Sequence, residues 1–115
     1  MYQFAYSEIV DDSPSELRAR ERHAMDEGIR LMRRAREKGP GSVEEVDALF
    51  YLRRLWTIFS DDLANPGNGL PTELRANLLS IGAWMLKEIE RARSGGATDL
   101  TSMIEINEII RDGLK

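Results

Sequence analysis

Apolar residues recur at helical spacing along most of this chain. In the first such segment they share less than half of the helical circle. These positions are Leu17, Ala24, Met25, Gly28, Ile29, Leu31, Met32 and Ala35. Ser13-Pro14-Ser15-Glu16, just before them, matches a capping box with proline at the first helical position. We therefore predict an amphipathic helix that starts at this box and ends at Gly39-Pro40-Gly41.

A second capping box, Ser42-Val43-Glu44-Glu45, opens the next predicted helix. This helix ends at the turn cluster Asn65-Pro66-Gly67-Asn68-Gly69. Its main apolar stripe consists of Ala48, Leu49, Leu52, Leu55, Trp56, Phe59 and Leu63. Further apolar side chains lie off that stripe, namely Val43, Val46, Phe50, Tyr51 and Ile58. A helix that is apolar nearly all round indicates either the centre of a bundle or a surface that binds a partner.

Two more helices follow. The third starts at Leu70-Pro71-Thr72-Glu73 and ends at Ser94-Gly95-Gly96. Its core stripe is Leu74, Leu78, Ile81, Met85 and Ile89, with Leu79, Trp84 and Leu86 on the flanks. The fourth is short, is capped by Thr98-Asp99 and ends near Gly113, and its isoleucines spread over more than half of the circle. The pattern predicts an all-α fold, a small four-helix bundle-like single domain with three long helices and a short C-terminal helix.

The N-terminal dozen residues follow another pattern. Tyr2, Phe4 and Tyr6 alternate with polar or small neighbours, which is compatible with an extended segment. A short helix through Ala5 and Ile9 fits equally well. At 115 residues the chain has the size of one domain. We expect a single helical domain over residues 1–115, with residues 1–12 as a candidate mobile segment.

Composition and charge limit where this protein works and what it binds. The chain has no cysteine, which suits a reducing compartment, and we expect a cytoplasmic location. Its net charge of −4 opposes direct binding to nucleic acid, which usually requires a clustered basic face. No apolar run approaches the roughly 20 residues of a membrane helix. The N-terminal Met1–Phe4 lacks the basic and apolar regions of a secretion signal, so we expect neither targeting nor a membrane anchor.

Catalytic chemistry has few candidates in this sequence. His23 is the single histidine and falls on the polar face of the first helix, where a general base lacks an orienting partner. Capping and solubility explain Asp11-Asp12 and Glu44-Glu45, whereas Asp61-Asp62 lies near the negative end of the second helix and could pair with a cation. The stretch Pro66-Gly67-Asn68-Gly69 lacks the lysine of a phosphate loop. We predict no enzyme, no metal site and no cofactor.

Surplus apolar surface is the feature that points to a function. Three helices with widened apolar faces leave hydrophobic area without an internal partner in a domain of this size. One interpretation places the second helix at the centre and the tryptophans in the core. The other is a groove that receives an amphipathic helix, and a homodimer would use the same surplus. Candidate partner contacts are Leu52, Trp56, Phe59, Leu79, Trp84 and Leu86, with Tyr2, Phe4 and Tyr6 as a candidate clamp.

Several short motifs are distinctive when taken together. They are the aromatic-rich start ending in Ala5-Tyr6, then Ser13-Pro14, Leu49 to Leu63 with Arg53-Arg54-Leu55-Trp56, Pro66, Asn68-Gly69-Leu70-Pro71, Leu74-Arg75-Ala76, Ile81-Gly82 and Ile109-Ile110-Arg111-Asp112-Gly113-Leu114. On these motifs the chain resembles the flagellar biosynthesis regulator FlaF family of alphaproteobacteria. The resemblance covers essentially the whole length, and its most specific part is the middle.

The resemblance implies a positive factor for flagellin production and filament assembly, which binds flagellin in the cytoplasm as an export chaperone or adaptor. Members of the family act opposite FlbT, a repressor of flagellin translation. Flagellin has amphipathic terminal helices, and surplus apolar helix faces suit such a client.

The alternative is a post-transcriptional regulator of flagellin messenger RNA that acts with or against FlbT. Direct RNA binding would use the arginines of the first helix, Arg18, Arg20, Arg22, Arg30, Arg33, Arg34 and Arg36. Acidic residues are interleaved with these arginines, which favours a solvated face of mixed sign.

Overall fold

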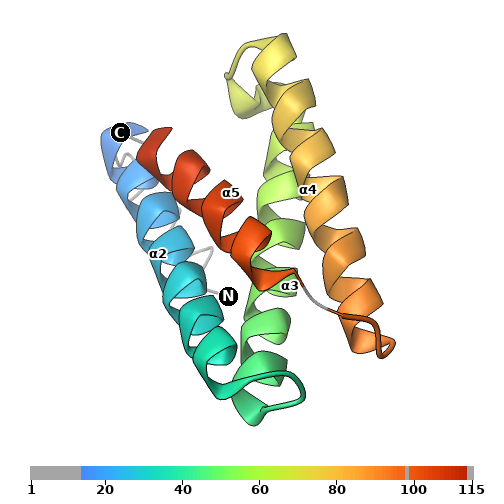
Figure 1. Ribbon diagram of the computed structural model, residues 1–115. Coiled ribbons are helices and arrows are strands. Elements are labelled where there is room, and N and C mark those ends of the chain that lie inside the picture. The colour runs from blue at the N-terminus through green and yellow to red at the C-terminus, as the bar shows by residue number, and fades with distance from the viewer. Residues whose placement is uncertain (1–13, 98, 114–115) are drawn as a thin grey trace.

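The computed structural model describes residues 14–97 and 99–113, and these residues form an all-α bundle (Figure 1). Its helices are α2 (Pro14–Lys38), α3 (Val43–Ala64), α4 (Thr72–Arg93) and α5 (Leu100–Gly113), with a short 3-10 helix η1 (Pro66–Asn68). The predicted fold class, with three long helices and a short C-terminal helix, is confirmed. The expectation of a mobile segment over residues 1–12 concerns residues outside the described ranges.

Side chains and glycines set the ends of the helices. Ser42 Oγ accepts a hydrogen bond from the Glu45 backbone N–H at 3.1 Å, as the second capping box predicts. The Glu45 carboxylate accepts from the backbone N–H of Gly41 at 2.9 Å, one residue before the position that the box predicts. At the start of α5, Asp99 Oδ1 accepts from the Ser102 N–H at 3.0 Å. The sequence therefore identifies both of these helix starts.

The turn cluster between α3 and α4 is held by polar side chains. Asn65 Oδ1 accepts from the Gly67 N–H at 2.8 Å, which starts the 3-10 turn. Gly69 ends that turn with a φ of 89°, a left-handed conformation that favours glycine. From α4, Arg75 Nε donates to the Leu63 carbonyl at 2.9 Å, and its Nη2 donates to the Asn65 carbonyl at 3.3 Å. Arg75 thus ties the start of α4 to carbonyls at the end of α3.

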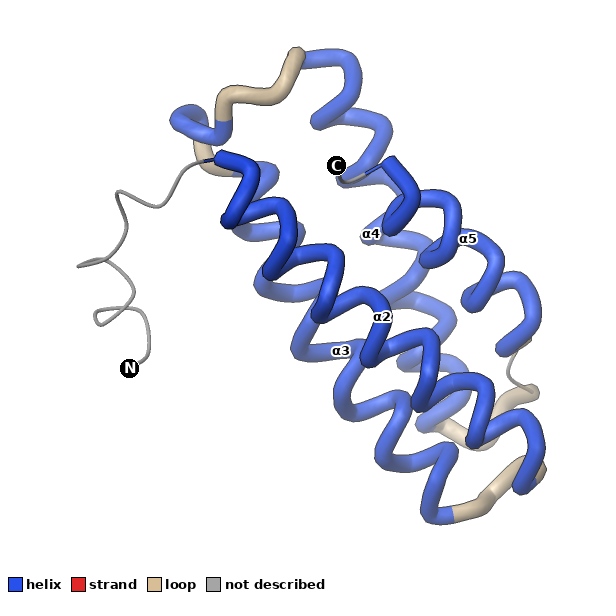
Figure 2. Tube along the Cα trace, turned by 90° about the vertical axis from the view of Figure 1, so that its left-hand side faces the viewer, coloured by secondary structure: helices blue, strands red, loops and turns tan. Residues whose placement is uncertain are grey.

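The helices alternate in direction, and Figures 1 and 2 show α5 at the front and α3 at the back, between α2 on one side and α4 on the other. The extensive helix contacts join α2 with α3, α2 with α5, and α3 with α4. The pair formed by α4 and α5 is not among them. Figure 1 shows these two helices diverging toward the end of the molecule that carries the α3–α4 turn. The side of the bundle between α4 and α5 is therefore less closely packed than the others, and we call it the open side.

The core gathers around α3, which packs on helices at two of its sides. Its buried apolar residues are Met25, Ile29, Met32, Ala35, Ala48, Leu49, Leu52, Trp56, Phe59, Leu63, Met85, Ile89, Leu100, Met103 and Ile104. The rings of Trp56 and Phe59 meet edge to face, with centroids 5.3 Å apart. Gly82 lets α4 approach closely, because a Cβ there would lie 2.6 Å from Ser60 Oγ and 3.2 Å from Trp56 Cε3. For Trp56, the interpretation as a core residue is confirmed.

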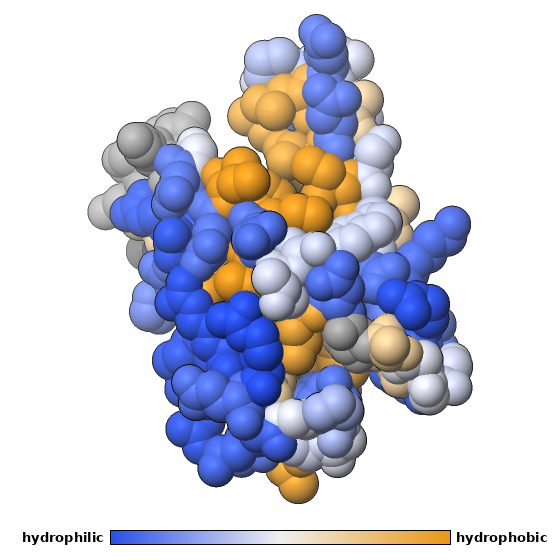
Figure 3. Space-filling view, in the orientation of Figure 1, coloured by the Kyte–Doolittle hydropathy of each residue, from blue (hydrophilic) through white to orange (hydrophobic). Residues whose placement is uncertain are grey.

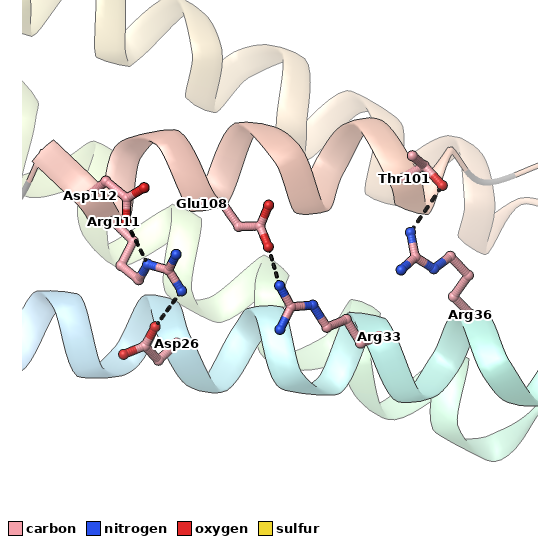
Figure 4. A network of polar contacts seen from close by, with 7 residues as sticks. All are labelled: Asp26, Arg33, Arg36, Thr101, Glu108, Arg111 and Asp112. Carbon is pink, nitrogen blue, oxygen red and sulfur yellow. Dashed lines mark hydrogen bonds and ion pairs between the residues drawn. The ribbon is translucent and has the colours of Figure 1, made fainter.

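Polar contacts hold α5 along α2 (Figure 4). Arg111 Nη1 lies 2.9 Å from Asp26 Oδ1, and Arg33 forms an ion pair with Glu108. Farther along the same seam, Arg36 donates to Thr101 Oγ1 at 3.2 Å. Since α5 contacts α2 extensively, these bonds set the lateral position of α5 and leave its other side directed toward α4. In the part of the chain that the structure describes, no helix has both the length and the apolarity needed to cross a membrane.

Candidate functional site

Apolar side chains remain partly exposed on the open side of the bundle. Figure 3 shows them gathered between α5 and the N-terminal half of α4. We call these residues the α4–α5 patch, and they are Leu70, Leu74, Leu78, Ile81, Ile106 and Ile110. Leu74 is 43% exposed, and the others are partly buried against the core. A cluster of this kind marks a surface that can bind an apolar partner.

One contact between α4 and α5 shows which of their faces look toward each other. Asn107 Nδ2 lies 3.8 Å from Met85 Sδ, so the face of α4 that carries Met85 is directed at α5. Ile81, Leu78 and Leu74 precede Met85 at helical spacing and continue that face. On α5, the patch isoleucines follow the buried Met103 by three and seven residues. The two apolar faces therefore oppose each other along the stretch where the helices diverge.

The predicted contacts on α3 lie beneath the surface. Leu52 and Trp56 have no exposed area, and Phe59 is 7% exposed. All three belong to the buried core, and neighbouring helices cover them in this structure.

The predicted contacts on α4 are more accessible. Leu79, Trp84 and Leu86 are partly buried and pack against the core. The predicted clamp residues Tyr2, Phe4 and Tyr6 lie outside the described residues. Whether any member of the predicted set binds a partner stays a prediction.

Sequence reasoning missed the patch because it treated the stripe Leu74, Leu78 and Ile81 as core. The sequence did not indicate which helices pack together, and in the structure α5 packs on α2. A signal was present, since the isoleucines of the fourth helix spread over more than half of the circle. Such a wide face in a short helix indicates that it does not bury all of its apolar side chains.

A second apolar surface lies on the outer side of α3, and we call it the α3 outer stripe. Its members are Val43, Val46, Phe50 and Ile58, with exposed fractions of 70%, 61%, 63% and 56%. The buried residues of α3 occupy the other side of the helix. The helix is therefore apolar on two sides, one that faces the core and one that is exposed to solvent.

The far end of the bundle has a cavity of about 680 Å³ where the α2–α3 and α4–α5 connections meet. Each of the three charged residues that line this cavity forms a hydrogen bond within the chain. Arg36 donates to Thr101, Glu45 accepts from Gly41, and Asp99 caps α5. The backbone hydrogen bond from Ser102 lowers the pKa of Asp99. This chemistry favours a structural junction over a ligand site.

Some of the arginines and acids named in the sequence analysis form contacts within this chain. Arg30 pairs with Glu27 at 2.6 Å, and the hydrogen bond lowers the pKa of Glu27. Asp62 Oδ2 accepts from Asn68 Nδ2 at 2.9 Å, which assigns this acid to the turn after α3. His23 is exposed. Among the described residues no group of three potential ligands is placed to hold a metal ion.

Comparison with known proteins gives one match. The sequence model of the family described as "Flagellar protein FlaF" matches residues 2–114, nearly the whole chain. Neither a curated protein nor a solved structure matches the chain. The matched range contains helices α2 to α5 and both apolar surfaces described above. The chain therefore belongs to the FlaF family of flagellar proteins.

Proposed function

We propose that this protein binds flagellin in the cytoplasm as an export chaperone or adaptor, and so promotes flagellin synthesis and filament assembly. Membership of the FlaF family supports the flagellar role. The α4–α5 patch is the observation that supports binding, because its apolar side chains remain partly exposed between two helices. An amphipathic helix is the partner that such a surface fits.

The shape of the site supports a helical client. Along α4, the stretch from Leu74 to Ile81 spans about 10 Å at the α-helical rise. Ile106 and Ile110 on α5 provide the facing wall, and α3 lies below. A client helix with apolar residues three and four positions apart would pack against α4 and α5 together. It would close the open side of the bundle as an added helix.

The free energy available suits a reversible complex. Fully burying one leucine-sized side chain contributes about 1.5–3 kcal/mol, and the patch residues are already partly buried, so each contributes less. Association itself costs about 4–15 kcal/mol in lost freedom of movement. The cost of association offsets much of the gain from the six patch residues, so we expect a weak and reversible affinity. A chaperone must release its client for export, and such an affinity allows that release.

The direct test is complex formation with purified monomeric flagellin, measured by size exclusion with light scattering and by calorimetry. We expect a defined complex and a negative heat-capacity change, because apolar surface is buried. Leu74→Glu should weaken binding at least about tenfold by placing a charge in the patch. Ile109→Glu is the matched control, since Ile109 is 71% exposed and is not a patch residue.

Absence of a complex at roughly tens of micromolar, with both proteins folded, would contradict the proposal. The partner would then be sought in FlbT or in flagellin messenger RNA. Of the arginines on α2, Arg30 and Arg33 form ion pairs with acids of this chain. These pairs favour the indirect route through FlbT over direct RNA binding.

A further inference from the structure

We propose that a second copy of this chain docks on the α3 outer stripe and forms a symmetric, antiparallel dimer. Each of the four stripe residues is more than half exposed. Single exposed apolar residues are ordinary, but a row of large ones on one rigid helix is typical of an interaction surface. This surface is distinct from the α4–α5 patch, and the inference does not depend on flagellin binding.

The spacing along α3 makes the first part of the stripe continuous. Val43, Val46 and Phe50 follow one another by three and four residues, so they share one face of the helix. Ile58 lies eight residues after Phe50, at the edge of that face. The Ser42 cap fixes the first turn, so Val43 is held on a regular helix. The stripe therefore presents a rigid surface about 22 Å long.

The charges beside the stripe indicate which partner it fits. Asp47 comes about one turn before Phe50, and Arg54 about one turn after it, on the same edge of the stripe. In an antiparallel pair related by a two-fold axis, side chains on the same edge face each other. With Phe50 near the axis, Asp47 of each copy then meets Arg54 of the other. Only the antiparallel orientation brings these two charges together, because a parallel two-fold pair would place the edges that carry them on opposite sides of the interface.

Both charges are available for such contacts. Over residues 14–97 and 99–113, Asp47 and Arg54 make no ion pair and no side-chain hydrogen bond, and both are exposed. Arg30, Arg91 and Arg93, by contrast, are paired with acids on their own helices. A second copy would give this acid and this base the partners that their own chain does not provide.

The expected dimer is weak. A standard interface buries about 800 Å² per partner, and one helix stripe offers less than that. We therefore expect a dissociation constant of roughly tens of micromolar. The dimer would use the outer side of α3 alone and would leave the α4–α5 patch of both copies uncovered.

Sedimentation equilibrium of the full chain, between about 1 and 500 µM, tests the proposal. We expect a monomer–dimer equilibrium that Phe50→Asp shifts toward monomer by at least about tenfold. Ile109→Asp should leave the equilibrium unchanged, because Ile109 is equally exposed but lies on α5. Circular dichroism checks that both variants remain helical. A wild-type chain that stays monomeric over the whole range would overturn the proposal.

A charge swap tests the antiparallel arrangement itself. Asp47→Arg and Arg54→Asp should each weaken self-association, by about tenfold, because like charges then face each other twice. When the two variants are mixed, the introduced charges face each other and the native pair is kept. Dimerisation should therefore return in the mixture. If the mixture dissociates as readily as the separate variants, the proposed dimer is wrong.

Discussion

Trp56 on α3 donates its indole N–H to Oδ1 of Asn107 on α5, at 3.1 Å inside the core. Asn107 is 1% exposed, and its Nδ2 donates to the Met103 carbonyl at 2.7 Å. A buried amide is tolerated when its donors and acceptor are occupied in this way. Because α5 packs mainly on α2, this bond ties α5 directly to the central helix. It helps to set how far α5 stands from α4, and hence the width of the α4–α5 patch.

Replacing Asn107 with leucine tests the structural role of this bond. The indole N–H of Trp56 would lose its acceptor while remaining buried, so we expect Asn107→Leu to lower the free energy of unfolding by about 1–3 kcal/mol. The matched control is Asn77→Leu at an exposed position of α4, where the change should stay within about 0.5 kcal/mol. Urea unfolding measures both. Equal stability of Asn107→Leu and the wild type would show that the bond contributes nothing.

Gly82 lies where α4 packs closely on Ser60 and Trp56 of α3, and Gly82→Ala tests that packing. A methyl group there would lie 2.6 Å from Ser60 Oγ, which is buried without a hydrogen-bond partner in the described structure. Overpacking of this kind costs about 1–3 kcal/mol, which outweighs the gain of up to about 1 kcal/mol in helix propensity. We expect net destabilisation in thermal or urea unfolding. Ser60→Ala should restore part of the loss, whereas a stabilised Gly82→Ala would contradict the close packing.

Tyr51 makes the free energy of unfolding depend on pH in the alkaline range. Its hydroxyl donates to the Ala24 carbonyl at 3.0 Å, and burial, with a smaller effect of Glu27, raises its pKa above 10.0. A raised folded-state pKa contributes stability that is present below pH 10 and is lost as the pH rises through the folded value. Tyr51→Phe should cost about 0.5–1.5 kcal/mol at pH 7. It should also flatten the fall in unfolding free energy above about pH 10. If the unfolding free energies of the variant and the wild type fall in parallel with pH, Tyr51 is not the group responsible.

The helix boundaries could be predicted from sequence because their signals are local. Proline, glycine and capping side chains act within one turn, so Ser42 and Asp99 mark their helix starts in this chain as they would in any other. Which helices pack together is a different matter. The pattern gave each helix an apolar face but did not say that α5 would lie on α2 and leave α4 uncovered.

In the candidate site too, the sequence identified apolar residues but not which of them are covered by other helices. Trp56 and Phe59 look like partner contacts on a helical wheel because they are large and aromatic, yet neighbouring helices cover them. Leu74 looks like core and is 43% exposed. Asn107 drew no notice, although a single amide among the apolar residues of a short helix can indicate a buried hydrogen bond. These outcomes depend on tertiary neighbours, which one sequence does not specify.

The most direct test of the central claim is methyl NMR of the protein labelled at leucine, isoleucine and valine, with unlabelled flagellin monomer added stepwise. We predict that the methyl signals that shift or broaden first belong to the α4–α5 patch, led by Leu74, Ile81 and Ile110. The signals of Val43 and Ile109, which are exposed elsewhere, should follow only with the overall broadening of a larger complex. Unchanged patch signals at saturating flagellin, or first changes confined to the α3 outer stripe, would contradict the proposal that this patch receives the flagellin helix.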